Sequence, residues 1–161
     1  MIFRAERPED HPAIRGLLVD AFGGPAEADL VEQLRADGDA AIALVAEQAG
    51  VVVGHVMFSP MAAPVRALAL APVAVAEDIR QQGIASRLIN AGLAIARERL
   101  WHMVFVLGEP AYYSRFGFDA SLAAGFASPY AGPYLMALAL NGENSVRTGE
   151  IRHAPAFAVF E

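Results

Sequence analysis

A short segment, Arg80 to Ser86, combines a cation, a glycine and the start of a helical pattern. The first turn of a helix leaves backbone N–H groups without internal partners, and the helix dipole adds partial positive charge at that end. A phosphate placed there meets both. Gly83 has no side chain to keep a ligand from the backbone. We therefore predict anion binding by Arg80, Gln81, Gln82, Gly83, Ile84, Ala85 and Ser86.

The alternative for this segment is an ordinary helix N-terminus, with Ser86 Oγ bonded to its own helix rather than to a phosphate. The residues before it favour the anion site. Leu68 to Val75 is an apolar run of strand length, and a strand followed by a glycine loop and a helix is typical of phosphate binding. Pro72 lies inside this run and cannot donate to a sheet ladder, so it marks an edge, a strand end or a bulge.

Arg80-x-x-Gly83-x-Ala85 after such a strand resembles the acyl-CoA-binding motif of the GNAT acetyltransferase superfamily. Further along, Tyr113-Ser-Arg-Phe-Gly117-Phe118 is similar to that family's Tyr-x-x-x-Gly-Phe element. The two motifs and the strand occur in the family's order, so the resemblance spans most of the chain. It implies an N-acetyltransferase that uses acetyl-CoA to acetylate a primary amine of a small molecule or a peptide.

The resemblance also assigns roles to single residues. The strand bearing Pro72 is expected to splay from its parallel neighbour, leaving a gap for the pantetheine arm of the cofactor. Backbone groups of Val73, Ala74 and Val75 are then expected to bond the amides and the thioester oxygen of acetyl-CoA. Tyr113 is expected to protonate the leaving thiolate, since an unperturbed tyrosine is protonated at neutral pH. The first two helices are expected to form one wall of the acceptor site.

One uncertain role and two departures from the family's pattern leave alternatives open. Tyr113 could instead be a core aromatic residue of a short helix. The run from Leu68 to Val75 has no carboxylate to act as a general base, and Glu109 could face the cleft or only solvent. The family often has an asparagine after the strand at Met103–Leu107, where this chain has Gly108-Glu109-Pro110 instead, and this puts a cofactor contact there in doubt. The missing carboxylate motivates a second hypothesis, a non-catalytic acyl-CoA-binding sensor or regulatory module.

The pattern of apolar residues predicts a mixed α/β fold with a single domain over residues 1–161. We expect a central mixed sheet of about six to seven strands, with a splayed parallel pair, flanked by helices. The predicted helices start near Asp10, Ala26, Ile84 and Ala111. The predicted strands are Ile2–Ala5, Ala41–Glu47, Val51–Phe58, Leu68–Val75, Met103–Leu107, Tyr134–Leu140 and Glu150–Phe160, with a turn at Asn141–Asn144.

Composition narrows the classes of partner. The net charge of −6 argues against nucleic acid, which favours basic surfaces. The chain has no cysteine, and its four histidines are dispersed, so we expect no metal site. No apolar run is long enough for a membrane span, and no signal peptide is evident, so we expect a cytoplasmic protein without membrane contact. The apolar late strands would suit a homodimer.

Overall fold

The structure is a computed structural model and describes residues 1–141 and 146–161. It has a mixed α/β fold with a six-stranded sheet in the strand order β1-β2-β3-β4-β5-β7 and a separate pair, β6 and β8. The strands are β1 Ile2–Ala5, β2 Ile42–Gln48, β3 Val51–Met61, β4 Ala67–Val75, β5 Met103–Leu107, β6 Phe126–Ala127, β7 Leu135–Ala139 and β8 Gly149–Glu150. The helices are α1 His11–Phe22, α2 Ala26–Ala36, α3 Ile84–Glu98, α4 Pro110–Tyr113 and α5 Ala120–Ala123, with 3-10 turns at Pro8–Asp10, Glu77–Ile79, Ser114–Phe116 and Pro155–Phe160.

The chain divides into two compact units. The first comprises Met1–Phe58 and Ala71–Ala94, and the second comprises Ser59–Leu70 and Ile95–Glu161. Strands β3 and β4 contribute residues to both units. The prediction of a single domain over the whole chain stays a prediction.

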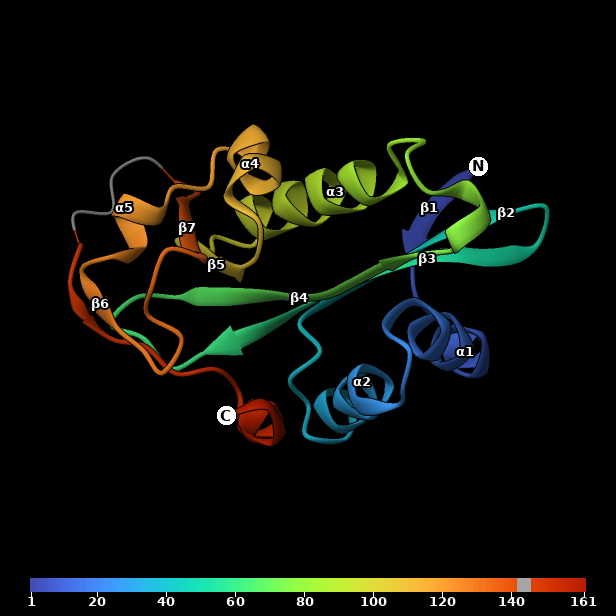
Figure 1. Cartoon of the computed structure of the whole chain (residues 1–161), viewed down its shortest axis with the longest axis horizontal. Coiled ribbons are helices and arrows are strands. Elements are labelled where there is room, and N and C mark those ends of the chain that lie inside the picture. The colour runs from blue at the N-terminus through green and yellow to red at the C-terminus, as the bar shows by residue number, and fades with distance from the viewer. Residues whose placement is uncertain (142–145) are drawn as a thin grey trace. The chain divides into compact units, whose positions relative to one another are not determined.

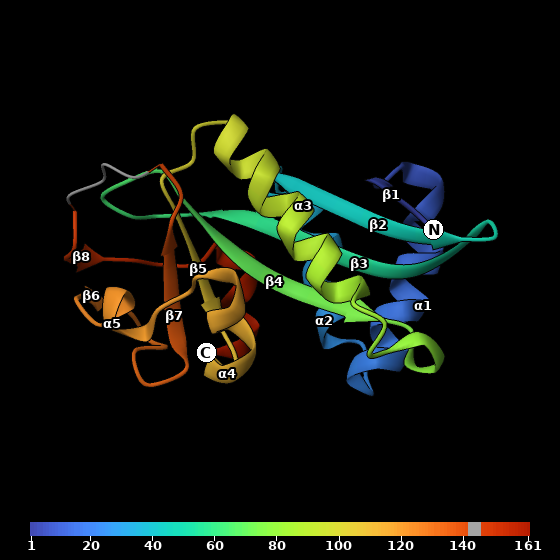
Figure 2. The same ribbon diagram turned by 90° about the horizontal axis from the view of Figure 1, so that it is seen from above.

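In the first unit, helices cover both faces of the antiparallel strands β1, β2 and β3. Figure 1 shows α1 and α2 on one face and α3 on the other. Figure 2 shows α3 lying across β3 and β4. Helix α3 packs closely on β3, because a Cβ atom added at Gly92 would lie 2.2 Å from the Phe58 ring. Its apolar side carries Ile84, Leu88 and Leu93, all buried, as the helical spacing of apolar residues predicts.

The second unit has its own apolar core. Strand β5 pairs with β7 in antiparallel register from Met103–Ala139 to Leu107–Leu135. Figure 1 shows α5 beside β6 and β7. Phe105 and Phe126 meet edge to face, with ring centroids 5.3 Å apart. Around them gather the buried side chains Met61, Ala67, Ala69, Met103, Ala123, Leu135, Ala137 and Ile151.

The parallel pair of the sheet has a short ladder. Strands β4 and β5 pair from Ala67–Met103 to Ala69–Phe105, although β4 continues to Val75 and β5 to Leu107. The pairing with β5 ends at Ala69, and Pro72, which has no N–H to donate, lies beyond it. Of the three alternatives for Pro72, an edge strand is wrong, because β4 lies between β3 and β5.

One late prediction differs from the structure, and another falls largely on residues that the structure does not describe. The strand predicted over Glu150–Phe160 is wrong, since β8 ends at Glu150 and a 3-10 helix occupies Pro155–Phe160. Pro155 stands at the start of this helix, where its missing N–H and fixed φ are tolerated. The predicted turn at Asn141–Asn144 extends into residues 142–145, which lie outside the described part of the chain.

Candidate active site

The loop between β4 and α3 exposes its backbone. Arg80, Gln81, Gln82 and Gly83 are all exposed, and Gly83 has a φ of +77°. Nothing lies within 4 Å of a Cβ atom added at Gly83, so the space above its backbone is open. A left-handed φ favours glycine, because a side chain there costs free energy. The loop therefore presents backbone that a ligand can approach closely.

The N-terminus of α3 follows directly and has free donors. The first hydrogen bond of the helix runs from Arg87 N to Gly83 O, at 3.0 Å. The N–H groups of Ile84, Ala85 and Ser86 precede it, so they have no partner within the helix. Ile84 contributes only its backbone here, because its side chain is buried in the core. These donors and the positive end of the helix dipole suit an anion such as a diphosphate.

Arg80 links the loop to the end of β4. Its Nε donates a hydrogen bond of 3.2 Å to the carbonyl oxygen of Val75. A guanidinium group has five N–H donors, so this bond leaves its two terminal nitrogens available. Arg80 can therefore hold the loop on the strand and still offer a positive charge to a phosphate.

The last residues of β4 present backbone donors on one side. Ala76 N donates to Val53 O at 2.8 Å, which points the Ala76 N–H toward β3. Because N–H groups of successive residues in a strand point to opposite sides, those of Val73 and Val75 point away from β3. Ala74 lies between them with its side chain buried. The pairing of β4 with β5 ends at Ala69–Phe105, so this ladder does not engage Val73 or Val75.

A cleft of about 570 Å³ adjoins this strand end and the loop. Leu17, Asp20 and Ala21 of α1 form one wall. The segment from Val75 to Asp78, together with Arg80, forms the other. Helix α1 and the predicted phosphate loop therefore border the same space, and its rim carries the carboxylates of Asp20, Glu77 and Asp78.

Tyr113 belongs to the second unit and ends α4. Its ring meets Tyr112 edge to face at 5.0 Å and Phe118 at 5.9 Å between centroids. Burial, and then the neighbouring Tyr112, raises the pKa of Tyr113 to about 12. The hydroxyl is therefore protonated throughout the neutral range. The structure brings Val73, Val75 and Arg80–Ser86 together in the first unit and gives Tyr113 a separate aromatic setting.

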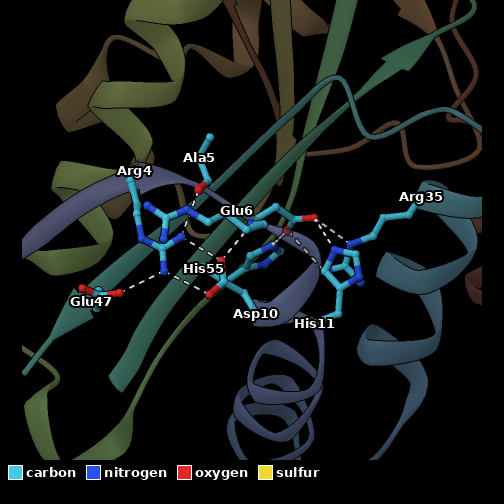
Figure 3. Close-up of polar contacts among 9 residues, drawn as sticks. Arg4, Ala5, Glu6, Asp10, His11, Arg35, Glu47 and His55 are labelled. Atoms are coloured by element: carbon cyan, nitrogen blue, oxygen red, sulfur yellow. Dashed lines mark hydrogen bonds and ion pairs between the residues drawn. The ribbon is translucent and has the colours of Figure 1, made fainter. Parts of the chain in front are cut away.

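A buried polar cluster around Glu6 was missed by the sequence analysis. Figure 3 shows His55, Arg35 and His11 converging on this carboxylate. Arg35 Nε donates to Glu6 at 2.7 Å and His55 Nε2 at 2.8 Å, while His11 Nε2 lies 3.4 Å away. Burial alone would raise the pKa of Glu6, but the bonds from His55 and Arg35 outweigh it and lower that pKa to about 2. Glu6 is therefore ionised at neutral pH.

His55 in this cluster is fully buried on β3. Its burial lowers its pKa, and the hydrogen bond to Glu6 opposes this only in part. Its Nδ1 has no hydrogen-bond partner within the described residues, so the neutral ring carries its proton on Nε2, toward Glu6. Glu6, Arg35 and His55 come from segments far apart in the chain, so no local spacing could have predicted that they meet.

A second ion pair fixes the start of α1 to β1. Both terminal nitrogens of Arg4 donate to Asp10, at 2.7 and 3.0 Å, and one also reaches Glu47 of β2 at 2.9 Å. Asp10 in turn accepts from Arg7 N. The hydrogen bond from Arg4 lowers the pKa of Asp10 to about 2. Together with the Glu6 cluster, this pair anchors α1 and α2, and so one wall of the cleft, to the sheet.

Within residues 1–141 and 146–161, no group of three or more histidine and acidic side chains could hold a metal ion. Across the same residues, no helix has both the length and the apolarity to cross a membrane.

The Acetyltransferase (GNAT) family matches residues 11–118, a range that includes the loop around Gly83 and Tyr113. The chain belongs to the GNAT acetyltransferase family. The uncharacterized N-acetyltransferase YhbS of Escherichia coli is 43% identical over 123 residues, which cover 74% of each chain. A second E. coli protein, the uncharacterized N-acetyltransferase YjhQ, is 34% identical over 166 residues, covering 94% of this chain and 91% of that protein.

Solved structures of other GNAT proteins share this fold. The crystal structure of E. coli YhbS in complex with CoA has a TM-score of 0.87 and 35% identity, and covers 97% of this chain and 91% of that one. A GNAT acetyltransferase from Brucella melitensis in complex with acetyl-CoA has a TM-score of 0.82 and 31% identity, and covers 97% of both chains. The predicted GNAT family and mixed α/β fold are confirmed.

Proposed function

We propose that this GNAT chain transfers an acetyl group from acetyl-CoA to a primary amine of a small molecule or a peptide. One observation carries the proposal: an exposed glycine loop and a free helix N-terminus follow β4. The CoA-bound and acetyl-CoA-bound neighbours, each matching nearly the whole chain, support acetyl-CoA as the donor. The open space at Gly83 supports the proposal, because no side chain keeps a ligand from the backbone there.

Binding of the donor, in this proposal, uses backbone more than side chains. The N–H groups of Ile84, Ala85 and Ser86 and the charge of Arg80 hold the diphosphate, in the loop that Gln81, Gln82 and Gly83 complete. Val73 and Val75, on either side of Ala74, hold the pantetheine amide and the thioester oxygen with their N–H groups. A fixed N–H donor at that oxygen stabilises the negative charge that develops there during attack.

The reaction itself is a direct displacement. The neutral amine attacks the thioester carbon that acetyl-CoA supplies, so a C–N bond forms and the C–S bond breaks. Tyr113 donates a hydrogen bond, and then its proton, to the leaving sulfur, and regains a proton from solvent. The amine releases its extra proton to water. Holding amine and thioester together can alone contribute about 7–11 kcal/mol to the rate enhancement.

A thiol-release assay tests the activity. Purified protein is mixed with acetyl-CoA and a panel of small-molecule and peptide amines, and free CoA is measured. Release that depends on both amine and protein supports the proposal. Acetyl-CoA binding by calorimetry with no turnover on any amine contradicts it and favours a non-catalytic acyl-CoA-binding module. The absence of a carboxylate from the sequence of β4, ALALAPVAV, favours that second function.

Substitution of Tyr113 tests its role. Tyr113→Phe keeps the ring and removes the hydroxyl, so we expect turnover to fall about tenfold or more while CoA affinity is unchanged. Tyr112→Phe is the matched control, because it removes a hydroxyl from the adjacent ring. Equal turnover in Tyr113→Phe and the parent protein would remove Tyr113 from the mechanism.

Two other expectations stay predictions: a cytoplasmic location and a homodimer.

A further inference from the structure

Gly108, the residue after β5, is packed against the ring of Tyr113. A Cβ atom added at Gly108 would lie 2.3 Å from Cε2 and 2.8 Å from Cδ2 of that ring. Such distances lie far inside van der Waals contact, so alanine at this position cannot coexist with the ring where it stands. Gly108 is not among the residues with a positive φ. Its backbone would accept alanine, and the requirement for glycine is therefore steric.

The ring has little room to yield. Tyr112 and Phe118 pack edge to face against it, and Phe116 lies 6.3 Å away between centroids. The backbone is also fixed, because Gly108 N donates to Tyr134 O at 3.0 Å and Tyr113 N donates to Glu109 O at 3.1 Å. An added methyl group therefore has to turn the Tyr113 side chain out of its pocket. The hydroxyl, at the far end of the ring, moves furthest.

We propose that Gly108 is a positioning residue for Tyr113: by having no side chain, it keeps open the space that fixes the direction of the tyrosine hydroxyl. The catalytic consequence rests on the proposed function of Tyr113.

Kinetics test the catalytic consequence. We expect Gly108→Ala to lower kcat by about tenfold to a hundredfold, the effect of a small misplacement of a reacting group, with little change in KM for acetyl-CoA. Gly16→Ala is the matched control. Gly16 is exposed on α1, has no positive φ and has no atom within 4 Å of an added Cβ. Gly16→Ala makes the same chemical change as Gly108→Ala and should leave kcat unaltered.

A double-mutant cycle separates positioning from a general loss of structure. If Gly108→Ala acts through the Tyr113 hydroxyl, adding it to Tyr113→Phe costs less than about twofold further, because the hydroxyl is already gone. If the fold losses in kcat of the two single variants multiply in the double variant, the inference is overturned.

A spectroscopic titration tests the packing of the Tyr113 ring without an enzyme assay. The phenol of Tyr113 is identified as the absorbance change above pH 11 that Tyr113→Phe removes. In Gly108→Ala its pKa should fall from about 12 toward the ordinary value near 10, because a displaced ring is less buried. If the Tyr113 titration is unaltered in folded Gly108→Ala protein, the inference is wrong. Full turnover in Tyr113→Phe protein would contradict only the catalytic role of Tyr113. Failure of the positioning role of Gly108 and failure of the catalytic role of Tyr113 are therefore distinguishable.

Misfolding of Gly108→Ala is also informative. The double variant Gly108→Ala with Tyr113→Leu has a smaller side chain in place of the ring. Recovery of a cooperative unfolding transition in this double variant supports the steric conflict, and continued misfolding rejects it.

Discussion

Gly83 and Gly108 are both needed as glycines, for opposite reasons. At Gly83 the backbone has a φ of +77° and nothing lies within 4 Å of an added Cβ, so conformation disfavours other residues while the space stays open. At Gly108 the φ is not positive, but the Tyr113 ring fills the space. The first region leaves its backbone open, where we propose that a ligand binds, and the second is filled by the chain's own side chains.

The difference predicts what substitutions do. In the open region around Gly83, a change should alter ligand binding and lower the free energy of unfolding by only about 1–2 kcal/mol, the cost of a side chain at a left-handed φ. In filled regions, a change should alter stability or the direction of a neighbouring side chain. The Glu6 cluster is a second filled region, because its charged side chains are partners for one another.

The largest expected effect is at the open region. Gly83→Asp places a carboxylate where we propose that the diphosphate binds, so repulsion and lost space should abolish detectable CoA binding. Calorimetry with CoA measures the affinity, and urea unfolding checks that the variant is folded. Gly83→Ala is the control, since it adds the backbone strain without the charge. Parent-like affinity in a folded Gly83→Asp protein would show that the loop does not bind phosphate.

The next effect is at the Glu6 cluster. Glu6→Gln leaves the charge of Arg35 half-buried without its counter-ion, so we expect the free energy of unfolding to fall by about 2–4 kcal/mol. CoA affinity should change much less, because Glu6 does not line the cleft beside the loop. Urea unfolding at pH 7 gives the first quantity. Glu9→Gln, an exposed carboxylate three residues away, serves as the control. Equal stability of the two variants would contradict a stabilising role for the cluster.

The same cluster predicts how stability depends on pH. His55 has a lowered pKa in the folded protein, so below about pH 6.5 the unfolded chain binds more protons and stability falls as pH falls. Glu6 acts in the same direction between its usual value of 4.5 and its folded pKa of about 2. We expect the urea midpoint to decrease steadily from pH 7 to pH 3, and less steeply below pH 4.5 in Glu6→Gln. Parallel curves would exclude the Glu6 contribution.

The smallest effect concerns Arg80. Arg80→Ala removes one charge and the hydrogen bond to Val75, so CoA affinity should fall about tenfold, with stability almost unchanged. Arg80→Lys keeps the charge and loses the planar geometry, and we expect an intermediate affinity. The loss in Arg80→Ala should shrink at high salt, because screening already weakens the charge in the parent protein. If the parent protein, Arg80→Ala and Arg80→Lys bind CoA equally well at low salt, Arg80 is not part of the binding site.

Much of the fold was predictable because its signals are local. Apolar periodicity predicted α1, α3 and β5, and β5 was predicted with its observed bounds, Met103–Leu107. The strand predicted up to Phe160 was wrong, because an apolar composition does not distinguish a strand from a short helix that begins at Pro155. The candidate site likewise has parts that local sequence predicted and parts that it did not. The loop could be read from Gly83 and its neighbours, and the family resemblance gave the expectation of a wall formed by the first two helices, of which α1 borders the cleft. The contact of Gly108 with Tyr113 could not be read from the sequence.

The sequence by itself determined the family, the strand–loop–helix order around Gly83, and the expectation of an anion at the start of α3. These depend on residues adjacent in the chain, whose backbone preferences and free N–H groups act over one helical turn. Only the tertiary structure decided that Glu6, Arg35 and His55 form one cluster, and that Gly108 is needed to make room for a ring. Burial and contact between residues distant in sequence depend on how the elements pack, and no local pattern encodes that packing.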